Sequence, residues 1–175
     1  RRGWRTTRAV PHAERGAPTR EVAIEVQGEQ FLLRGDRALY WPRLQWLIVS
    51  DLHLGKVQSL RRDGVALPDA VIDDDLQRLE GAVRATKASR LVVLGDLVHD
   101  AHGLTAAVVS RVARWRDALD ADVALVPGNH DRRVKALPHE WRLIELASVI
   151  VERGFRLTHA PMDGVGFNWH GHIHP

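Results

Sequence analysis

Acidic, amide and imidazole side chains recur in this sequence in short groups that together could bind metal ions. In chain order the groups are Asp51-Leu52-His53, Gly95-Asp96, Gly128-Asn129-His130-Asp131, His159 and Gly171-His172-Ile173-His174. A single aspartate after a strand is usually a turn or capping residue, and a single histidine is usually a surface residue. The combination is not explained in that way, since the tetrapeptide at 128–131 alone is rare at ordinary residue frequencies. The groups therefore indicate a functional site.

The ligand types predict which metals could bind. The chain has no cysteine, which excludes thiolate zinc sites, iron–sulfur clusters and disulfides. Carboxylate, imidazole and amide ligands suit Mn, Fe, Zn or Ni ions, and one aspartate can bridge two cations about 3.5–4 Å apart. Asp51 and His53 are two residues apart, so their side chains point to the same side of an extended strand end. Gly95 and Gly128 would let the backbone approach the site without a Cβ clash.

The segments before these groups have the pattern of buried strands. Trp46–Val49, Leu91–Leu94 and Val123–Val126 are continuous apolar runs, as expected for strands covered on both faces. Between them, apolar positions at helical spacing predict amphipathic helices over Ile72–Val83 and Leu104–Leu119. Alternating strands and helices predict a parallel sheet. Because the carboxyl ends of parallel strands meet at one edge, the polar groups would converge there.

Shorter strands are expected on both sides of this central region. Residues 22–26 alternate apolar and polar, and a Gln-Gly turn leads to Phe31–Leu33, which predicts a hairpin. Beyond Pro138 the pattern predicts strands over Ser148–Glu152 and Phe155–His159, then a loop to the terminus. The fold class expected is α/β.

The ordered groups resemble the motifs of the calcineurin-like metallophosphoesterase superfamily. That family carries D-x-H, G-D-x-x-(x)-D, G-N-H-(E/D), a lone histidine and G-H-x-H, and the resemblance runs from Val22 to the end of the chain. It implies a metallophosphoesterase-type β-sandwich flanked by helices (αββα), forming one domain over residues 21–175. Because the family's chain continues beyond G-H-x-H, the resemblance also implies a domain truncated at its C-terminus, with strands missing after Pro175.

The resemblance implies a role for each matching residue. The ligands of the first metal ion would be Asp51, His53 and His174. Those of the second would be Asn129, His159 and His172, and Asp96 would bridge the two ions. His130 matches the family's catalytic histidine, which contacts the phosphoryl group and can protonate the leaving oxygen. The reaction implied is hydrolysis of phosphate esters by a hydroxide activated by two divalent ions, manganese first among them, with Fe, Zn, Ni or Mg also accepted by these ligands.

Three longer segments are similar to one bacterial branch of this superfamily, the ligase-associated DNA damage response endonucleases (PdeM). The segments are 51–56, 61–68 and 128–133. This similarity implies a DNA-repair-associated nuclease or phosphodiesterase, DNA as substrate, and a functional link to a DNA ligase and a helicase. Lys56, Arg61 and Arg62 would then be candidates for contacts with substrate phosphates. Solvated surface charges are an equally expected interpretation of these three residues.

One position departs from the pattern of the phosphoprotein phosphatases. They place an aspartate three residues after the bridging aspartate, whereas here that position is His99 and Asp100 follows it. The difference counts against a protein-phosphatase activity and leaves open which group orients His130. His99, Asp100 and Asp131 are candidates for residues that support the ligands.

Charge is distributed unevenly along the chain. The formal net charge is +3, but residues 1–20 carry +5 and the remainder carries −2. A disordered basic tail is therefore expected over 1–20, and the folded part should have no overall attraction for phosphate polymers. No apolar run approaches the roughly 20 residues needed to cross a membrane, and no export signal is found in the tail. Together with the absence of cysteine, this favours the cytoplasm.

Two alternatives to a phosphodiesterase remain open at this point. One is a phosphomonoesterase or a cyclic-nucleotide phosphodiesterase with the same ligands. The other is an inactive truncated remnant that binds metal or a repair partner, because a ligand at the very end of the chain would be poorly held in place.

Overall fold

The computed structural model describes residues 19–67, 70–164 and 166–173. Its helices are α1 (Lys56–Arg62), α2 (Ala70–Thr86) and α3 (Ala106–Ala118), with 3₁₀ turns η1 (Asp131–Arg133) and η2 (His139–Trp141). The strands are β1 (Glu21–Val26), β2 (Glu29–Arg34), β3 (Ala38–Trp41), β4 (Trp46–Val49), β5 (Arg90–Leu94), β6 (Asp122–Val126), β7 (Ile144–Glu145), β8 (Val149–Glu152), β9 (Phe155–Thr158) and β10 (Phe167–His170).

The larger sheet has seven strands in the order β1-β2-β3-β4-β5-β6-β7. Strands β1 to β4 are joined by antiparallel pairs, and β4 to β7 are parallel. The predicted hairpin, three buried strands and two amphipathic helices are all confirmed. Strand β3 and helix α1 were not predicted, because short segments carry too little periodic pattern to be recognised.

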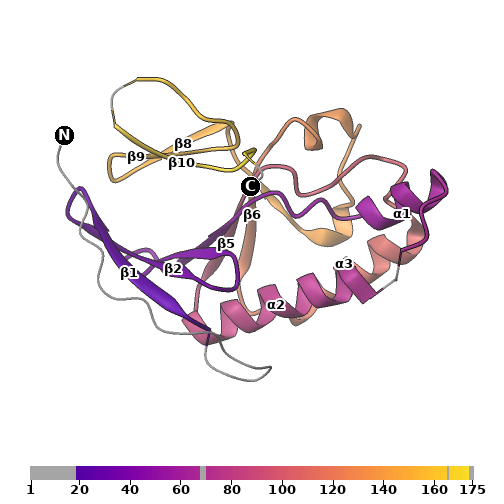
Figure 1. Ribbon diagram of the computed structural model, residues 1–175, viewed down its shortest axis with the longest axis horizontal. Helices are drawn as coiled ribbons and strands as arrows, with labels where there is room; N and C mark the ends of the chain where they lie inside the picture. The colour runs from indigo at the N-terminus through magenta and orange to yellow at the C-terminus, as the bar shows by residue number, and fades with distance from the viewer. Residues whose placement is uncertain (1–18, 68–69, 165, 174–175) are drawn as a thin grey trace.

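Alternate residues of the central strands face different layers, as the period of a β-strand requires. Leu47 and Val49 of β4 pack in the cluster that includes α2 and α3. Ile48, between them, packs in a second cluster with the smaller sheet. Figure 1 shows the result, with α2 and α3 lying along one face of the large sheet and β8–β10 covering the other. The expected α/β fold with two packed sheets is confirmed, but the described helices α2 and α3 cover only the large sheet, so the helices expected on both sides of the sandwich (αββα) are not seen among the described residues.

The smaller sheet has the order β10-β9-β8. Its apolar face, including Phe155 and Leu157, packs on Phe31 and Trp41 of the large sheet, with the Phe31 and Phe155 rings 5.1 Å apart. The expectation of a loop from His159 to the terminus is wrong, because β10 pairs in parallel with β9. A four-residue strand after a glycine-containing loop is defined by its partner, and the sequence pattern does not reveal that partner.

Two expectations fall on residues outside the described ranges. They are the basic tail, of which only residues 19 and 20 are described, and the ligand His174. Among the described residues, no helix combines the length and the apolar character needed to cross a membrane.

Glu29 joins the two sheets through charged hydrogen bonds. Its carboxylate accepts hydrogen bonds from Trp41 Nε1 (3.1 Å) on β3 and from Arg153 Nε (2.9 Å) in the turn between β8 and β9. These two bonds lower the pKa of Glu29 from its usual 4.5, with a smaller contribution from the charge of Arg43, whereas burial opposes the shift.

We predict that Glu29→Gln lowers the free energy of unfolding at neutral pH and makes that free energy depend less on pH. Because the pKa of Glu29 is lower in the folded chain, its contribution to stability is present above about pH 4.5 and is lost as the pH falls through the folded pKa. Urea unfolding at pH 7 and at about pH 4 measures this loss. Glu25→Gln, an exposed change on β1, is the matched control. The prediction would be contradicted if the free energy of unfolding fell by the same amount between pH 7 and about pH 4 in the wild type and in Glu29→Gln.

Candidate metal centre

The predicted ligands converge at one edge of the sandwich. Asp51, Asp96 and Asn129 lie just beyond the carboxyl ends of β4, β5 and β6. His159 and His172 come from the smaller sheet, just after β9 and β10. Chain segments more than 100 residues apart therefore contribute to one site, as expected for the carboxyl end of a parallel sheet.

The first group consists of Asp51, His53 and Asp96. One ligand atom from each lies within 4.8 Å of the other two. Backbone hydrogen bonds fix their loops, since the Asp51 amide donates to the Gly95 carbonyl (3.0 Å) and the His53 amide donates to the Asp96 carbonyl (2.9 Å). The aspartates and the histidine predicted for the first metal ion are thus close enough to bind one ion.

The second group consists of Asp96, His159 and His172. His159 Nε2 lies 3.5 Å from Asp96 Oδ2 and 3.0 Å from His172 Nδ1. Asn129 Oδ1 lies 2.9 Å from the same His159 nitrogen. His159 Nδ1 is turned toward the Leu94 carbonyl at 3.0 Å, an arrangement that leaves Nε2 as the ligand atom. The residues predicted for the second metal ion therefore meet.

Asp96 belongs to both groups and is almost completely buried, with 2% of its surface exposed. Its Oδ1 accepts a hydrogen bond from the His130 amide (2.9 Å). Its Oδ2 faces the imidazoles of His53 (3.9 Å) and His159 (3.5 Å). A buried carboxylate requires compensating positive charge. The donor set and its position between two groups fit a carboxylate that bridges two cations.

Burial favours the uncharged form of two imidazoles in this region. Burial is the largest cause that lowers the pKa of His53 to about 4. The charge of Asp96 opposes this shift, and the charge of Lys56 adds to it. Burial likewise lowers the pKa of His99. A neutral imidazole offers the nitrogen lone pair that a metal ion needs. The state of His53 therefore fits its predicted role as a ligand.

Residues 45–174 match the family described as calcineurin-like phosphoesterase. This segment covers most of the chain and contains all of the ligand groups described above. The chain belongs to the calcineurin-like phosphoesterase family. The expected superfamily and enzyme class are confirmed, since this is a family of binuclear metal hydrolases and both ligand groups are present.

A solved structure supports the assignment of this phosphoesterase to its family. The crystal structure of Pseudomonas putida nuclease MPE superimposes with a TM-score of 0.78 at 29% sequence identity. The alignment covers 89% of this chain and 74% of that chain. No curated protein sequence matches the phosphoesterase at a significant level.

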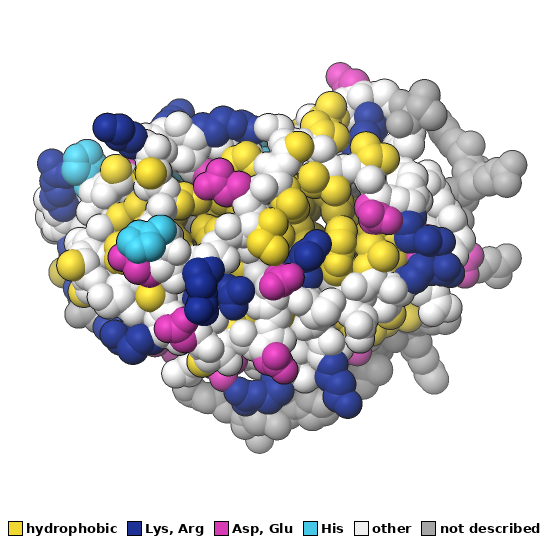
Figure 2. Space-filling view, turned by 180° about the vertical axis from the view of Figure 1, so that it is seen from behind, with side chains coloured by type: hydrophobic (Ala, Val, Ile, Leu, Met, Phe, Trp, Pro, Cys, Tyr) yellow, Lys and Arg dark blue, Asp and Glu magenta, His cyan; other side chains and the backbone are white. Residues whose placement is uncertain are grey.

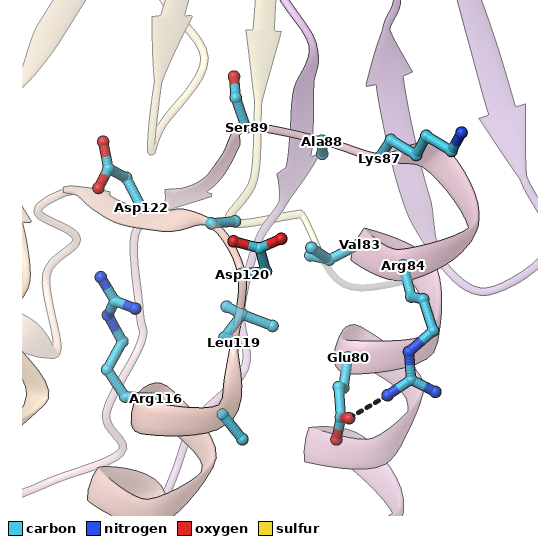
Figure 3. Close-up of a pocket in the computed structure, with 12 residues that line it drawn as sticks. Glu80, Val83, Arg84, Lys87, Ala88, Ser89, Arg116, Leu119, Asp120 and Asp122 are labelled. Atoms are coloured by element: carbon cyan, nitrogen blue, oxygen red, sulfur yellow. Dashed lines mark hydrogen bonds and ion pairs between the residues drawn. The ribbon is translucent and has the colours of Figure 1, made fainter.

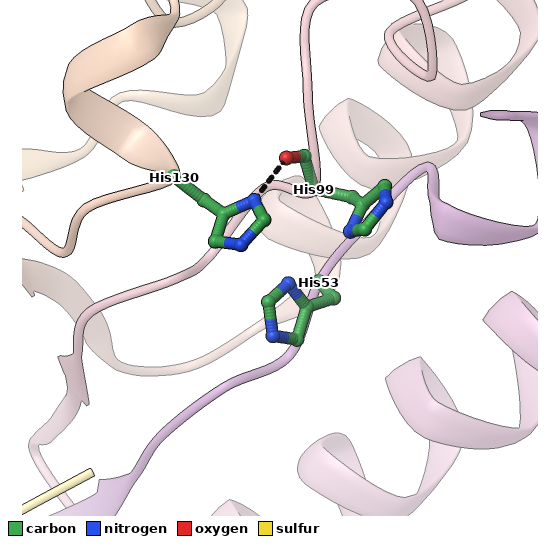
Figure 4. A group of neighbouring side chains, drawn as sticks. All are labelled: His53, His99 and His130. Atoms are coloured by element: carbon green, nitrogen blue, oxygen red, sulfur yellow. Dashed lines mark hydrogen bonds between the residues drawn. The ribbon is translucent and has the colours of Figure 1, made fainter. Parts of the chain in front are cut away.

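The structure identifies the group that orients His130. Its Nδ1 lies 2.5 Å from the backbone carbonyl oxygen of His99, and Figure 4 marks this contact with a dashed line. Because a carbonyl oxygen only accepts hydrogen bonds, Nδ1 carries the proton and donates the bond. The two rings are stacked, with centroids 5.2 Å apart. The position where a protein phosphatase has an aspartate thus supplies a main-chain oxygen in this phosphoesterase. This arrangement leaves His130 Nε2 as the nitrogen on the side of Asp96, at 4.0 Å from Oδ2.

Asp131 and Asp100, which were also expected to support the ligands, accept hydrogen bonds that connect neighbouring loops. Asp131 is buried, which raises its pKa, and it accepts hydrogen bonds from the amides of Val98 (3.1 Å) and Gly128 (2.8 Å). Asp100 accepts bonds from the Gly103 amide and the Ser59 hydroxyl, both at 2.8 Å. Asp131 therefore joins the loops after β5 and β6, and Asp100 joins the first of these to α1. Ser59 was missed, because nothing in the sequence predicted helix α1.

The three basic residues expected to contact substrate have different surroundings. Lys56 is exposed at the start of α1, and its charge adds to burial in lowering the pKa of both His53 and His99. Arg61 donates a hydrogen bond from Nε to the Leu67 carbonyl (2.7 Å) and so braces the loop after α1. Arg62 is exposed at the end of the same helix. The charge of Lys56 is thus felt at His53, a predicted ligand.

Several candidate ligands have a left-handed backbone, which is uncommon for residues other than glycine. The φ angles are 55° at Asp51, 47° at His53, 51° at Asp96 and 69° at His172. Each such conformation costs about 1–3 kcal/mol. Four of the ten described non-glycine residues with positive φ are thus candidate ligands, and backbone strain of this kind often occurs at functional sites.

Close backbone contacts explain the glycines beside the ligands. A Cβ on Gly95 would lie 2.2 Å from His159 Nδ1, and one on Gly128 would lie 2.3 Å from Asp96 Oδ1. Real Cβ atoms do not approach other atoms so closely, and the neighbour would have to move. The sequence-based interpretation of these glycines as points of close approach is thus confirmed.

We predict that Gly128→Ala displaces Asp96 and weakens Mn²⁺ binding at least about tenfold, with a loss of about 1–3 kcal/mol in stability from overpacking. Isothermal titration calorimetry and urea unfolding measure the two effects. Gly81→Ala is the matched control, because a Cβ at this position in α2 would meet no atom within 4 Å. That change should stabilise the helix by about 0.5–1 kcal/mol and leave Mn²⁺ binding unaltered. Wild-type affinity in Gly128→Ala would refute this account of the site.

Proposed function

We propose that this phosphoesterase hydrolyses phosphodiester bonds in DNA or a closely related nucleotide chain. The single observation that carries the proposal is the buried carboxylate of Asp96, which belongs to two adjoining groups of metal ligands. Similarity to a nuclease from Pseudomonas putida supports a nucleic acid as the substrate. A phosphodiester is negatively charged, and neutralising that charge requires cations close to the phosphorus.

The proposed ligands follow the two groups. One cation would be held by Asp51 and His53 together with His174, which lies outside the described residues. The other would be held by Asn129, His159 and His172, and Asp96 would contact both. Two divalent cations at these positions supply Lewis-acid chemistry, which activates water and neutralises charge on the phosphate oxygens. Manganese is the metal that we propose, and the oxygen and nitrogen donors suit it.

His130 is proposed as the residue that handles the proton of the leaving group. The His99 carbonyl accepts the hydrogen bond from Nδ1, so Nε2, 4.0 Å from Asp96 Oδ2, would face a phosphate bound at the metal centre. An imidazolium at this position can donate its Nε2 proton to the leaving oxygen and keep Nδ1 hydrogen-bonded throughout. We propose that Lys56, whose charge contributes to the lowered pKa of His53, contacts the same phosphate.

The finer assignment is to the ligase-associated DNA damage response endonucleases, PdeM. We propose it from the segments 51–56, 61–68 and 128–133, together with the nuclease comparison. On this proposal the protein acts in DNA repair alongside a ligase and a helicase.

Long-range electrostatics would contribute little to DNA binding by the folded part. Residues 21–175 carry a formal charge of −2, and Figure 2 shows basic and acidic side chains interspersed on one face. Binding that is independent of sequence relies on clustered basic residues that neutralise phosphates. Affinity would therefore come mainly from the metal centre and from contacts beside it.

We predict that Asp96→Asn abolishes Mn²⁺-dependent hydrolysis of bis-p-nitrophenyl phosphate. The amide keeps the shape of the carboxylate but removes the charge that holds both cations, so the loss should exceed about a hundredfold. Release of p-nitrophenol measures the rate, and circular dichroism with thermal unfolding checks the fold. Asp74→Asn, an exposed change on α2, should retain full activity. Undiminished turnover in Asp96→Asn would refute the two-cation mechanism.

The class of ester is tested with the wild-type protein. A phosphodiesterase should hydrolyse bis-p-nitrophenyl phosphate faster than p-nitrophenyl phosphate and should nick single-stranded DNA when Mn²⁺ is present. Preference for the monoester would replace the nuclease proposal with a phosphomonoesterase. Binding of Mn²⁺ without hydrolysis of either ester would identify an inactive relative.

A further inference from the structure

Positive charge is concentrated in the segment that directly follows the proposed proton donor. Three basic residues lie within five positions of His130, namely Arg132, Arg133 and Lys135. The acidic residue between His130 and Glu140 is Asp131, which is buried and accepts hydrogen bonds from two backbone amides. The segment therefore carries positive charge with no exposed acid of its own.

The 3₁₀ turn η1 places Arg133 on the same side of the chain as His130. The Arg133 amide donates a hydrogen bond to the His130 carbonyl (3.1 Å), which closes the turn. In a 3₁₀ turn, side chains three residues apart are eclipsed and lie about 6 Å apart along the axis, at about 2 Å per residue. The side chain of Arg133 therefore leaves the backbone on the same side as the imidazole that faces Asp96.

Lys135 shares the outer side of this segment with Arg133. Val134, between them, has an extended backbone (φ −90°, ψ 127°) and packs on the core cluster that includes α2 and α3. Successive side chains of an extended segment point to opposite sides. Arg133 and Lys135 therefore point away from the core, and both are exposed.

The charges of Arg133 and Lys135 are not neutralised by other described residues. Neither side chain makes a hydrogen bond or an ion pair within the part of the chain that the structure describes. Arg132 differs, because its Nη2 donates a hydrogen bond to Ser148 Oγ (2.9 Å) in the loop before β8. We call Arg133 and Lys135 the basic pair.

The basic pair and Lys56 flank the loop that carries Asp96. Lys56 begins α1, which follows β4, whereas the basic pair follows β6. In the sheet, β5 lies between these two strands, and Asp96 follows β5. A DNA strand whose scissile phosphate lies at Asp96 would therefore have a positive group on either side. Because every nucleotide carries a phosphate, the phosphates beside the scissile one also require cations.

A wide cavity of about 960 Å³ lies at the opposite end of the sheet, where β5 and β6 begin. Its lining, drawn in Figure 3, includes three basic and three acidic residues, and Arg84 is paired with Glu80. This cavity offers a phosphate no excess of positive charge. The basic pair is therefore better placed than the cavity to hold a DNA strand.

We propose that Arg133 and Lys135 bind the phosphate next to the scissile one on a DNA strand. The guanidinium of Arg133 would present two N–H donors to the phosphate oxygens, a geometry that matches this group. The proposal rests on the proposed phosphodiesterase function. It specifies a polynucleotide as the substrate, because an isolated diester has no neighbouring phosphate.

Two substrates separate the basic pair from the chemistry. A short oligothymidylate carries neighbouring phosphates, and bis-p-nitrophenyl phosphate carries none. With Mn²⁺, we expect Arg133→Gln in the full chain to lower kcat/KM for the oligothymidylate about tenfold, the effect of losing one hydrogen bond between charged groups. The rate with bis-p-nitrophenyl phosphate should not change. Arg114→Gln, an exposed change on α3, removes the same charge as a matched control and should alter neither rate.

A binding measurement makes the test independent of catalysis. Fluorescence anisotropy of a labelled oligothymidylate in EDTA follows binding without cleavage, and the basic pair needs no metal ion to bind a phosphate. The logarithm of the binding constant falls linearly with the logarithm of the NaCl concentration, and each lost contact reduces the slope by about 0.7 for a single strand. We expect this reduction in Arg133→Gln and in Lys135→Gln. It should be absent in Arg133→Lys, which keeps the charge, and in Arg114→Gln.

The outcomes distinguish the two proposals. If bis-p-nitrophenyl phosphate is hydrolysed but either Arg133→Gln or Lys135→Gln keeps the wild-type slope, the basic pair is refuted and the phosphodiesterase stands. If both variants reduce the slope but the wild type hydrolyses neither substrate, the phosphate contact stands and the proposed function fails. An equal reduction in Arg114→Gln, or equal binding of a methylphosphonate oligothymidylate that lacks backbone charge, would refute recognition of a phosphate by this pair.

Discussion

The burial of one carboxylate, that of Asp96, constrains the whole site. Taking an ionised carboxylate out of water is costly unless positive charge and hydrogen bonds compensate it. The His130 amide supplies one such bond, and the imidazoles of His53, His130 and His159 surround the other oxygen. Each neighbouring loop therefore has to come close to this carboxylate. The glycines and the left-handed backbone conformations at the site are consequences of that close approach.

The site depends on contributions from both sheets. The large sheet ends in loops that carry the aspartates, Asn129 and His53, whereas His159 and His172 come from the smaller sheet. Apolar packing between Phe31, Trp41 and Phe155 holds the two sheets together, and Glu29 joins them through Arg153. The distance between the ligand groups is thus set by the interface between the sheets, since a shift of about 1 Å is enough to disrupt a preorganised site.

A main-chain carbonyl, that of His99, orients the ring of His130 in this phosphoesterase. The His99 carbonyl fixes the ring of His130 regardless of which side chain follows the bridging aspartate by three residues. The imidazole of His99 is thereby free to pack against His53 and His130.

The sequence by itself determined the family, the sandwich and most of the ligand groups. Apolar runs followed by Asp51, Asp96 and Asn129 predicted strands that end at a common edge, because buried strands and polar loop residues leave strong local patterns. Strands β3 and β10, helix α1 and the carbonyl that orients His130 were decided only by the tertiary structure. The two strands and the helix are too short to leave a clear periodic pattern, and the carbonyl belongs to the backbone, which every residue shares. Each of these features also depends on a partner that is distant in sequence.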